Sequence, residues 1–193
     1  MKIISGLFMA AALLAAAPAV AATSIVTAGK LTGASGVKIG NLLYNVSFVD
    51  GSCGTVYGKC ETSSFDFKNV DDALAAVSAL FEQVLIGNYS RRPGDVFGCG
   101  AFTCDTYVAF GLDLGEARIA IASNRRSNQI GFDGYLPTNY STTAEPTANF
   151  ARFTLQAAAA VPEPATWAMM LIGFSMIGGA VRYRRRSTVT TYA

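Results

Sequence analysis

The chain has 193 residues, four cysteines and no histidine. The lack of histidine excludes Ser-His-Asp and Cys-His nucleophiles, as well as metal sites built on imidazole. The formal net charge of +2 comes from the chain ends, because residues 22–161 hold ten Lys and Arg against twelve Asp and Glu. This mildly acidic body argues against nucleic acid as a partner.

The first segment, residues 1–21, has the pattern of an export signal. One lysine precedes an apolar run over residues 3–17. Ala19 and Ala21 then provide the small side chains that signal peptidase accepts before its cut. We expect cleavage after Ala21, with Ala22 as the alternative, and an exported mature chain.

The body opens with extended segments. Strands are expected over residues 24–27 and 40–49, and a shorter extended piece over 65–67. In the second strand, apolar side chains alternate with their neighbours in the way expected of a strand with one buried face. The alternating residues are Leu42, Tyr44, Val46 and Phe48.

One segment has the pattern of an amphipathic helix. Asn69 can act as the N-cap, and two aspartates follow it in the first turn, where negative charge stabilises a helix. Gly87 and Asn88 provide the stop. The apolar residues that would share one stripe are Leu74, Val77, Phe81 and Val84.

The second half of the body is predicted to be mostly strand and loop. Strands over 106–112 and 117–122 would form a hairpin across a short turn. Residues 123–149 are rich in turn formers and are expected to be loop, before a last strand over 150–155. Residues 22–156 are therefore predicted to form a strand-rich α+β domain with one main helix.

The four cysteines are expected to form two disulfides, because an even number in an exported chain is typical of a stapled fold. We expect the local pairs Cys53–Cys60 and Cys99–Cys104, since each closes a short loop containing glycine. Each would add about 2–3 kcal/mol of stability. A four-cysteine zinc site is the alternative, but the Cys-x2-Cys knuckles of such sites are missing.

Carboxylates could still support glycoside hydrolysis, but none stands in a catalytic pattern. Asp71 and Asp72 lie at the predicted helix start, and Asp113 and Glu116 flank the predicted hairpin turn. Asp113, Glu116 and Asp133 are candidate calcium ligands, but the sequence lacks the Asp-rich spacing of a calcium-binding loop. We therefore predict no catalytic residue, no cofactor and no metal site.

The C-terminal segment combines a stiff motif with an apolar run. Pro162 and Pro164 hold the chain extended around Glu163, so a processing enzyme could bind this stretch without unfolding it. The apolar run over 165–181 contains Trp167, an aromatic residue suited to a membrane interface. From that tryptophan onward, the run would measure about 22 Å as a helix. A bilayer core of about 30 Å makes a transmembrane span feasible but strained.

A basic cluster closes this run and would set its orientation. Positive charge holds a flanking segment in the cytoplasm, which predicts a cytoplasmic tail over 182–193 and an outward-facing body. Residues 157–164 would then be the linker that carries the Pro-Glu-Pro motif. The arginines of the cluster are Arg182, Arg184, Arg185 and Arg186.

Residues 161–186 resemble a known sorting signal. The stretch VPEPATWAMMLIGFSMIGGAVRYRRR is similar to the PEP-CTERM signal in its PEPxxWA variant, a tail also described as the ice-binding protein C-terminal domain. The resemblance implies processing by exosortase, with Pro162, Glu163 and Pro164 as the recognition motif. It also implies 165–181 as the transmembrane part and the arginines as the cytoplasmic stop.

The resemblance further implies a Gram-negative host that makes exopolysaccharide. The expected route is a single-pass inner-membrane precursor, processed by signal peptidase and exosortase, and then the cell surface or extracellular matrix. The favoured function is a non-enzymatic surface or biofilm matrix protein, with exopolysaccharide as the candidate partner. The alternative is an exported carbohydrate-active hydrolase. Ice binding is disfavoured, because the body lacks the repeated threonine arrays that such surfaces use.

Overall fold

The structure is a computed structural model that describes residues 21–126, 128–157 and 164–186. The chain divides into two compact units, one ending at Gln156 and the other beginning at Ala157.

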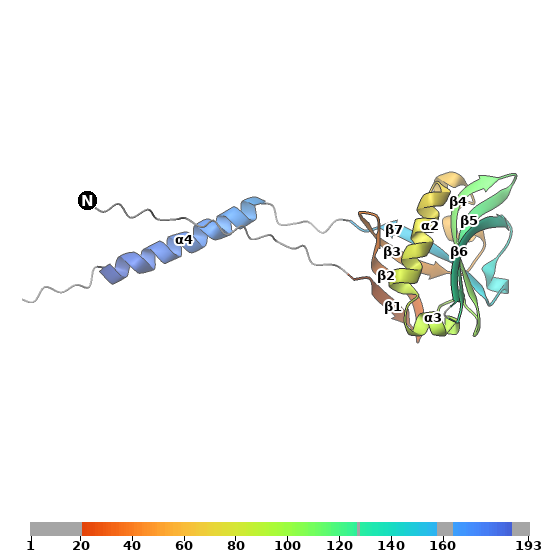
Figure 1. The fold of residues 1–193 in the computed structure, drawn as a ribbon. Helices are drawn as coiled ribbons and strands as arrows, with labels where there is room; N and C mark the ends of the chain where they lie inside the picture. The colour runs from red at the N-terminus through yellow and green to blue at the C-terminus, as the bar shows by residue number, and fades with distance from the viewer. Residues whose placement is uncertain (1–20, 127, 158–163, 187–193) are drawn as a thin grey trace, which may run out of the picture. The chain divides into compact units, whose positions relative to one another are not determined.

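The first unit is built on one sheet with the strand order β1-β2-β3-β7-β4-β5-β6 (Figure 1). Neighbouring strands run antiparallel except β7 and β4, which are parallel. The seven strands within the described residues are β1 Thr23–Thr27, β2 Lys30–Ile39, β3 Leu42–Val49, β4 Cys104–Asp113, β5 Glu116–Arg125, β6 Asn128–Pro137 and β7 Ala148–Leu155.

The helical segments of this unit are short apart from one. That one is α2, Val70–Ala79, which continues directly into the π-helical turn η2, Leu80–Val84, and lies across the sheet (Figure 1). The others are α1 Cys53–Tyr57, η1 Thr62–Ser64, α3 Asn88–Arg91, η3 Pro93–Asp95 and η4 Thr142–Ala144.

Helix α2 begins where the sequence predicts, but the side chains that it buries differ in part from the predicted stripe. The Asn69 side chain accepts the Asp72 backbone N–H at 2.9 Å, which confirms the predicted cap. Of the predicted stripe, Leu74 and Phe81 are only partly buried. The fully buried positions include three small residues and a leucine of the π turn. They are Ala73, Ala76, Ala79 and Leu80.

Close packing against the sheet explains this shift. A Cβ on Gly131 of β6 would lie 2.9 Å from a methyl carbon of Val77, so the helix passes directly over the strand. Small side chains on α2 permit that approach. The π turn, closed by the Leu85 N–H on the Leu80 carbonyl at 2.7 Å, then ends the helix at Val84, before the predicted stop.

Both faces of the central strands are buried. One cluster fills the space between α2 and the sheet and includes Val108 and Phe110 of β4. The second lies on the opposite face and joins Tyr107 and Phe150 to α1 through Tyr57. Alternate side chains of β4 therefore enter different clusters, as strand geometry requires.

The sequence pattern missed one strand in the Gly-rich stretch after β1. Strand β2 buries Leu31, Ala34 and Val37, which do not alternate regularly because a register shift lies between Ala34 and Val37. Its far end is held by Gln83 of η2, whose amide exchanges two 2.8 Å hydrogen bonds with the Lys38 backbone. The bulge hid the period-two pattern.

The predicted loop over 123–149 was wrong, because β6 forms within it. This strand pairs with β5 in continuous register from Arg125↔Asn128 to Glu116↔Pro137. It is an edge strand with mostly exposed side chains, including Ile130, Phe132 and Tyr135, and its two glycines and final proline resemble those of a loop. The predicted β4–β5 hairpin is confirmed, with Asp113 opposite Glu116. The predicted strand over 65–67 does not form.

The second unit contains α4, Pro164–Arg186. Among the residues that the structure describes, no helix is long and apolar enough to cross a membrane. The predicted transmembrane segment over 165–181 is therefore helical but not confirmed as a span. Gly173, Ser175 and the Gly178-Gly179 pair interrupt an apolar run that is already short.

Candidate functional sites

Both predicted disulfides are present. Cys53 at the start of α1 bonds to Cys60, with their Cα atoms 5.3 Å apart, and Cys99 bonds to Cys104 at the start of β4, at 4.9 Å. All four cysteines are therefore used as staples, and the zinc alternative has no free thiol. Each disulfide ties an irregular segment to the end of a regular one.

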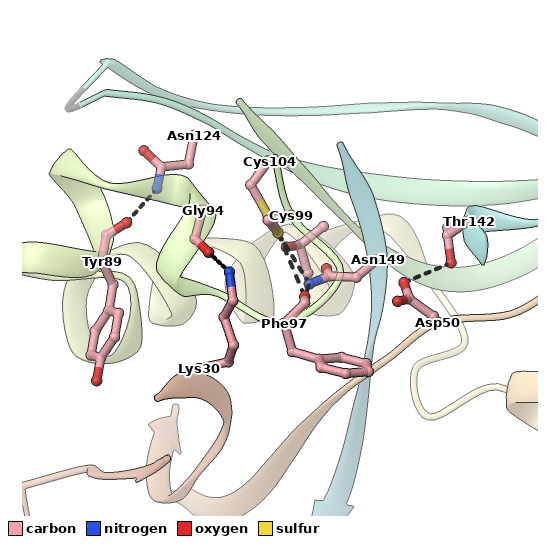
Figure 2. The surroundings of a disulfide bond; sticks show 11 residues. Lys30, Asp50, Tyr89, Gly94, Phe97, Cys99, Cys104, Asn124, Thr142 and Asn149 are labelled. Carbon is pink, nitrogen blue, oxygen red and sulfur yellow. Dashed lines mark hydrogen bonds between the residues drawn. A yellow bond between two sulfur atoms is a disulfide. The ribbon is translucent and has the colours of Figure 1, made fainter. Parts of the chain in front are cut away.

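Buried amides hold the segment around the second disulfide (Figure 2). The Asn149 amide on β7 donates to the Phe97 carbonyl at 2.5 Å and lies 3.4 Å from the Cys99 sulfur. The Asn124 amide on β5 donates to the Tyr89 carbonyl at 2.9 Å. Both side chains are fully buried. They fix main-chain carbonyls of the 88–104 segment, which is a structural role.

The Asp50 carboxyl, directly after β3, has a perturbed pKa. Partial burial raises its pKa, and the Thr142 hydroxyl, which donates to Oδ1 at 3.2 Å, opposes the rise (Figure 2). The chain at Gly98 passes so close that a Cβ there would lie 2.4 Å from the same oxygen. This crowding leaves no room for a substrate at Asp50 from that side.

The predicted carboxylate candidates lie in three separate places: the first turn of α2, the β4–β5 turn and the edge strand β6. Asp71 and Asp72 lie in the first turn of α2. Asp113 and Glu116 close the β4–β5 turn, and Asp133 lies on β6 opposite Ala120. Across the described parts of the chain, no group of three or more His, Cys, Asp or Glu is placed to hold a metal ion.

One surface pocket combines aromatic, amide and carboxyl groups. It has a volume of about 430 Å³ and lies where the β2–β3 turn, the 66–68 segment and the first turns of α2 meet. Its polar lining includes Asn41, Asp66 and Asp72, and its apolar lining includes Tyr44 and Phe67. We call it the α2 pocket. Sequence reasoning missed it, because its lining comes from three separate segments.

The two carboxylates of the α2 pocket differ in their bonding. Asp66 accepts hydrogen bonds from the Arg152 guanidinium, including Nε at 3.0 Å, and from the Phe153 N–H at 2.7 Å. Asp72 accepts from the Asn69 amide at 2.7 Å through Oδ2. Asp66 is therefore tied into the fold, while Asp72 keeps one oxygen directed at no described protein group.

A second pocket of about 380 Å³ lies beside the 93–101 segment. Lys30, Arg92 and Asp95 line it together with Cys99. The Lys30 ammonium group donates to the Gly94 carbonyl (Figure 2). One of the two basic side chains that line this pocket is therefore already bonded to the main chain.

The predicted sorting residues lie partly within the described chain. Pro164 begins α4, Trp167 is exposed on it, and Arg182 is exposed near its end. The helix continues through the remaining arginines to Arg186. Outside the described residues lie Pro162 and Glu163, the signal segment 1–20 with Ala19, and the last residues 187–193.

Residues 160–186 match the family model described as the PEP-CTERM protein-sorting motif. The chain carries a PEP-CTERM sorting motif. This motif indicates an exported protein that is sorted via the membrane and processed by exosortase. It covers the tail alone. No curated protein and no solved structure matches the chain.

Proposed function

We propose that this chain is a non-enzymatic protein of the cell surface or biofilm matrix of a Gram-negative bacterium. The PEP-CTERM motif over 160–186 carries the proposal, because it places the chain among exosortase substrates. Exopolysaccharide of the matrix is the proposed partner. Nucleic acid is not proposed as a partner, because residues 22–161 hold more acidic than basic side chains.

The proposed route has two processing steps. Signal peptidase cuts after Ala21, which leaves Ala22 before β1, so the sheet loses no strand. The precursor is then held at the inner membrane by its tail, as a single-pass protein, until exosortase acts at the Pro-Glu-Pro motif. The mature body is left at the surface or in the matrix.

The body suits a passive extracellular role. Two disulfides staple it, and they persist in an oxidising compartment. Its buried polar side chains, such as Asn124 and Asn149, bond to main-chain carbonyls. The carboxylates considered as catalytic groups lie in a helix cap, a turn and an edge strand.

A carbohydrate-active hydrolase is the second candidate, because the α2 pocket contains two carboxylates. Retaining and inverting glycosidases both need one carboxyl that exchanges protons and one that attacks or activates water. Asp66 is poorly suited to either role, because the Arg152 guanidinium and the Phe153 N–H already occupy its oxygens. This bonding favours binding over hydrolysis.

The sorting proposal is tested with a Pro162→Ala, Pro164→Ala double variant in a host that has exosortase. The native protein is expected to lose both ends and to appear outside the inner membrane. The double variant should remain longer and membrane-bound, because the stiff motif is gone. Intact-mass measurement with and without reduction reports both cleavages and both disulfides.

Pro146→Ala is the matched control, since Pro146 is an exposed proline of the body outside the motif. This variant should be processed like the native chain. Unchanged size and location of the double variant would contradict sorting through the Pro-Glu-Pro motif.

A further inference from the structure

The α2 pocket has the size and position of a ligand site. Its volume of about 430 Å³ falls in the range of about 300–1,000 Å³ that small-molecule sites occupy. Gly40 and Asn41 of the β2–β3 turn form one side, and Asp72 and Ala75 of α2 form another. These elements belong to the well-packed first unit, so the pocket is formed without any ligand.

The apolar side of the pocket is aromatic. Tyr44 of β3 packs against Phe67, with ring centroids 5.8 Å apart and planes tilted by 48°. Phe153 packs on both rings from β7, with centroids 6.2 Å from Tyr44 and 5.2 Å from Phe67. Leu42 beside them is 49% exposed. The electron-rich face of an aromatic ring attracts weakly positive C–H groups, such as those on one face of a sugar ring.

Two of the charged groups around the pocket are already hydrogen-bonded within the protein. Asp66 is paired with Arg152 at 3.0 Å. The Lys68 ammonium group donates to the carbonyls of Thr62 at 2.7 Å and Ser63 at 2.8 Å, and to a third carbonyl. A ligand could bond directly to either group only by displacing these protein partners.

The remaining polar groups suit hydroxyl groups. Asp72 offers one carboxylate oxygen, because only the other is bonded to Asn69. Asn41 and Tyr44 line the pocket, and the amide of the first and the hydroxyl of the second make no hydrogen bond with the residues that the structure describes. A carboxylate acceptor, an amide and a phenol can each bond to a hydroxyl. An anionic ligand would instead be repelled by Asp72.

We propose that the α2 pocket binds a neutral sugar unit of a polysaccharide, with its C–H face on Tyr44 and its hydroxyls on Asp72 and Asn41. This proposal rests on the proposed function in one respect: the polysaccharide is taken to come from the surrounding matrix. The binding chemistry itself rests on the pocket. A single carboxylate oxygen with one amide is too few ligands for a calcium ion, which takes six to eight oxygens.

The test is calorimetric titration of the full chain, purified in detergent, with cellohexaose, maltohexaose and mannohexaose as neutral probes and polygalacturonate as the anionic probe. At least one neutral probe is expected to bind. Asp72→Asn and Asn41→Ala should each weaken that binding about fivefold to tenfold, the effect of one lost hydrogen bond. Tyr44→Phe keeps the packing of the ring and should cause a smaller loss.

Asp71→Asn is the matched control, because Asp71 lies in the same first turn of α2 but does not line the pocket. This variant should bind like the native chain. The proposal is overturned if no neutral probe binds, if polygalacturonate binds as tightly as the neutral probes, or if the Asp72 and Asn41 variants match the control. The secretion assay with the Pro162 and Pro164 variant is independent of these outcomes, so either proposal can fail alone.

Discussion

The guanidinium group of Arg152 on β7 lies against the carboxylate of Asp66, with Nε 3.0 Å from Oδ2. The same group stands 4.6 Å from the centre of the Tyr57 ring and donates to the Val56 carbonyl of α1. Asp66 in turn accepts the Phe153 N–H. One arginine therefore joins α1, the 65–67 segment and β7, and it keeps a wall of the α2 pocket in place.

Removing this arginine should destabilise the body. Arg152→Ala is expected to lower the free energy of unfolding by about 2–4 kcal/mol, because the Asp66 carboxylate is left partly buried without its cation. Arg152→Lys should lose less, since it keeps the charge but not the two-pronged geometry. Urea denaturation measures both. Arg118→Ala is the control, because Arg118 also packs on an aromatic ring, with its guanidinium carbon 4.9 Å from the centre of Phe110. A loss of unfolding free energy equal to that of Arg152→Ala would contradict the role of the ion pair.

The stability of the body should depend on the ionisation of Asp50. Its folded-state pKa lies above its ordinary value of 3.8 because burial disfavours the charged form. The folded protein then holds this proton more tightly than the unfolded chain. The contribution of Asp50 to stability is therefore greatest in acid and declines as the pH rises from about 3.8 through the folded-state pKa.

Asp50→Asn tests this dependence, because asparagine keeps an oxygen for the Thr142 hydroxyl but does not ionise. Urea midpoints measured from pH 4 to pH 8 should fall less with rising pH in this variant than in the native chain. Asp113→Asn, at the exposed β4–β5 turn, serves as the control. Identical pH profiles for native protein and Asp50→Asn would show that the carboxyl is not perturbed.

Gly33 on β2 is required by close contact with its neighbouring strand. A Cβ at this position would lie 2.2 Å from the Val46 carbonyl oxygen, which is main chain and has no room to move. Gly33→Ala should therefore cost about 2–3 kcal/mol in the free energy of unfolding. At Gly111 the nearest atoms to such a Cβ are 3.7 Å away. Gly111→Ala should be nearly neutral in the same denaturation assay, and equal effects would contradict the steric argument.

Leu114 is an unfavourable residue at its position and offers a stabilising substitution. It is fully exposed and has a φ of 47°, and it is followed by Gly115 at 84° in the two-residue β4–β5 turn. Such turns favour Asn-Gly, because asparagine tolerates the left-handed region. Leu114→Asn should raise the free energy of unfolding by about 1 kcal/mol. Thermal and urea unfolding should agree; a loss of stability would contradict the turn assignment.

Features that depend on neighbours in the sequence were predicted well. The Asn69 cap and the β4–β5 hairpin each depend on a few consecutive residues. The two disulfides also close short loops, of sequence separation 7 and 5. Local contacts of this kind leave a pattern in the chain.

Features that depend on distant partners were missed. β6 has mostly exposed side chains and contains two glycines, and it forms a strand by pairing with β5 over ten residues in continuous register. The 65–67 segment has the alternation of a strand, but no strand forms there. Its Asp66 side chain instead pairs with Arg152 of β7, which lies 86 positions away in the sequence. The α2 pocket likewise needs three segments to meet. No local pattern records these contacts.

The sorting motif could be identified from the sequence alone, because such a motif is recognised as a continuous stretch of chain and residues 160–186 contain it whole. The sequence also predicted that the body is strand-rich, stapled by disulfides and built around one main helix. The strand order, the buried face of α2 and the position of the α2 pocket emerge only in the folded chain. Those features arise from packing between residues far apart in the chain, where backbone pairing and close contact outweigh local preference.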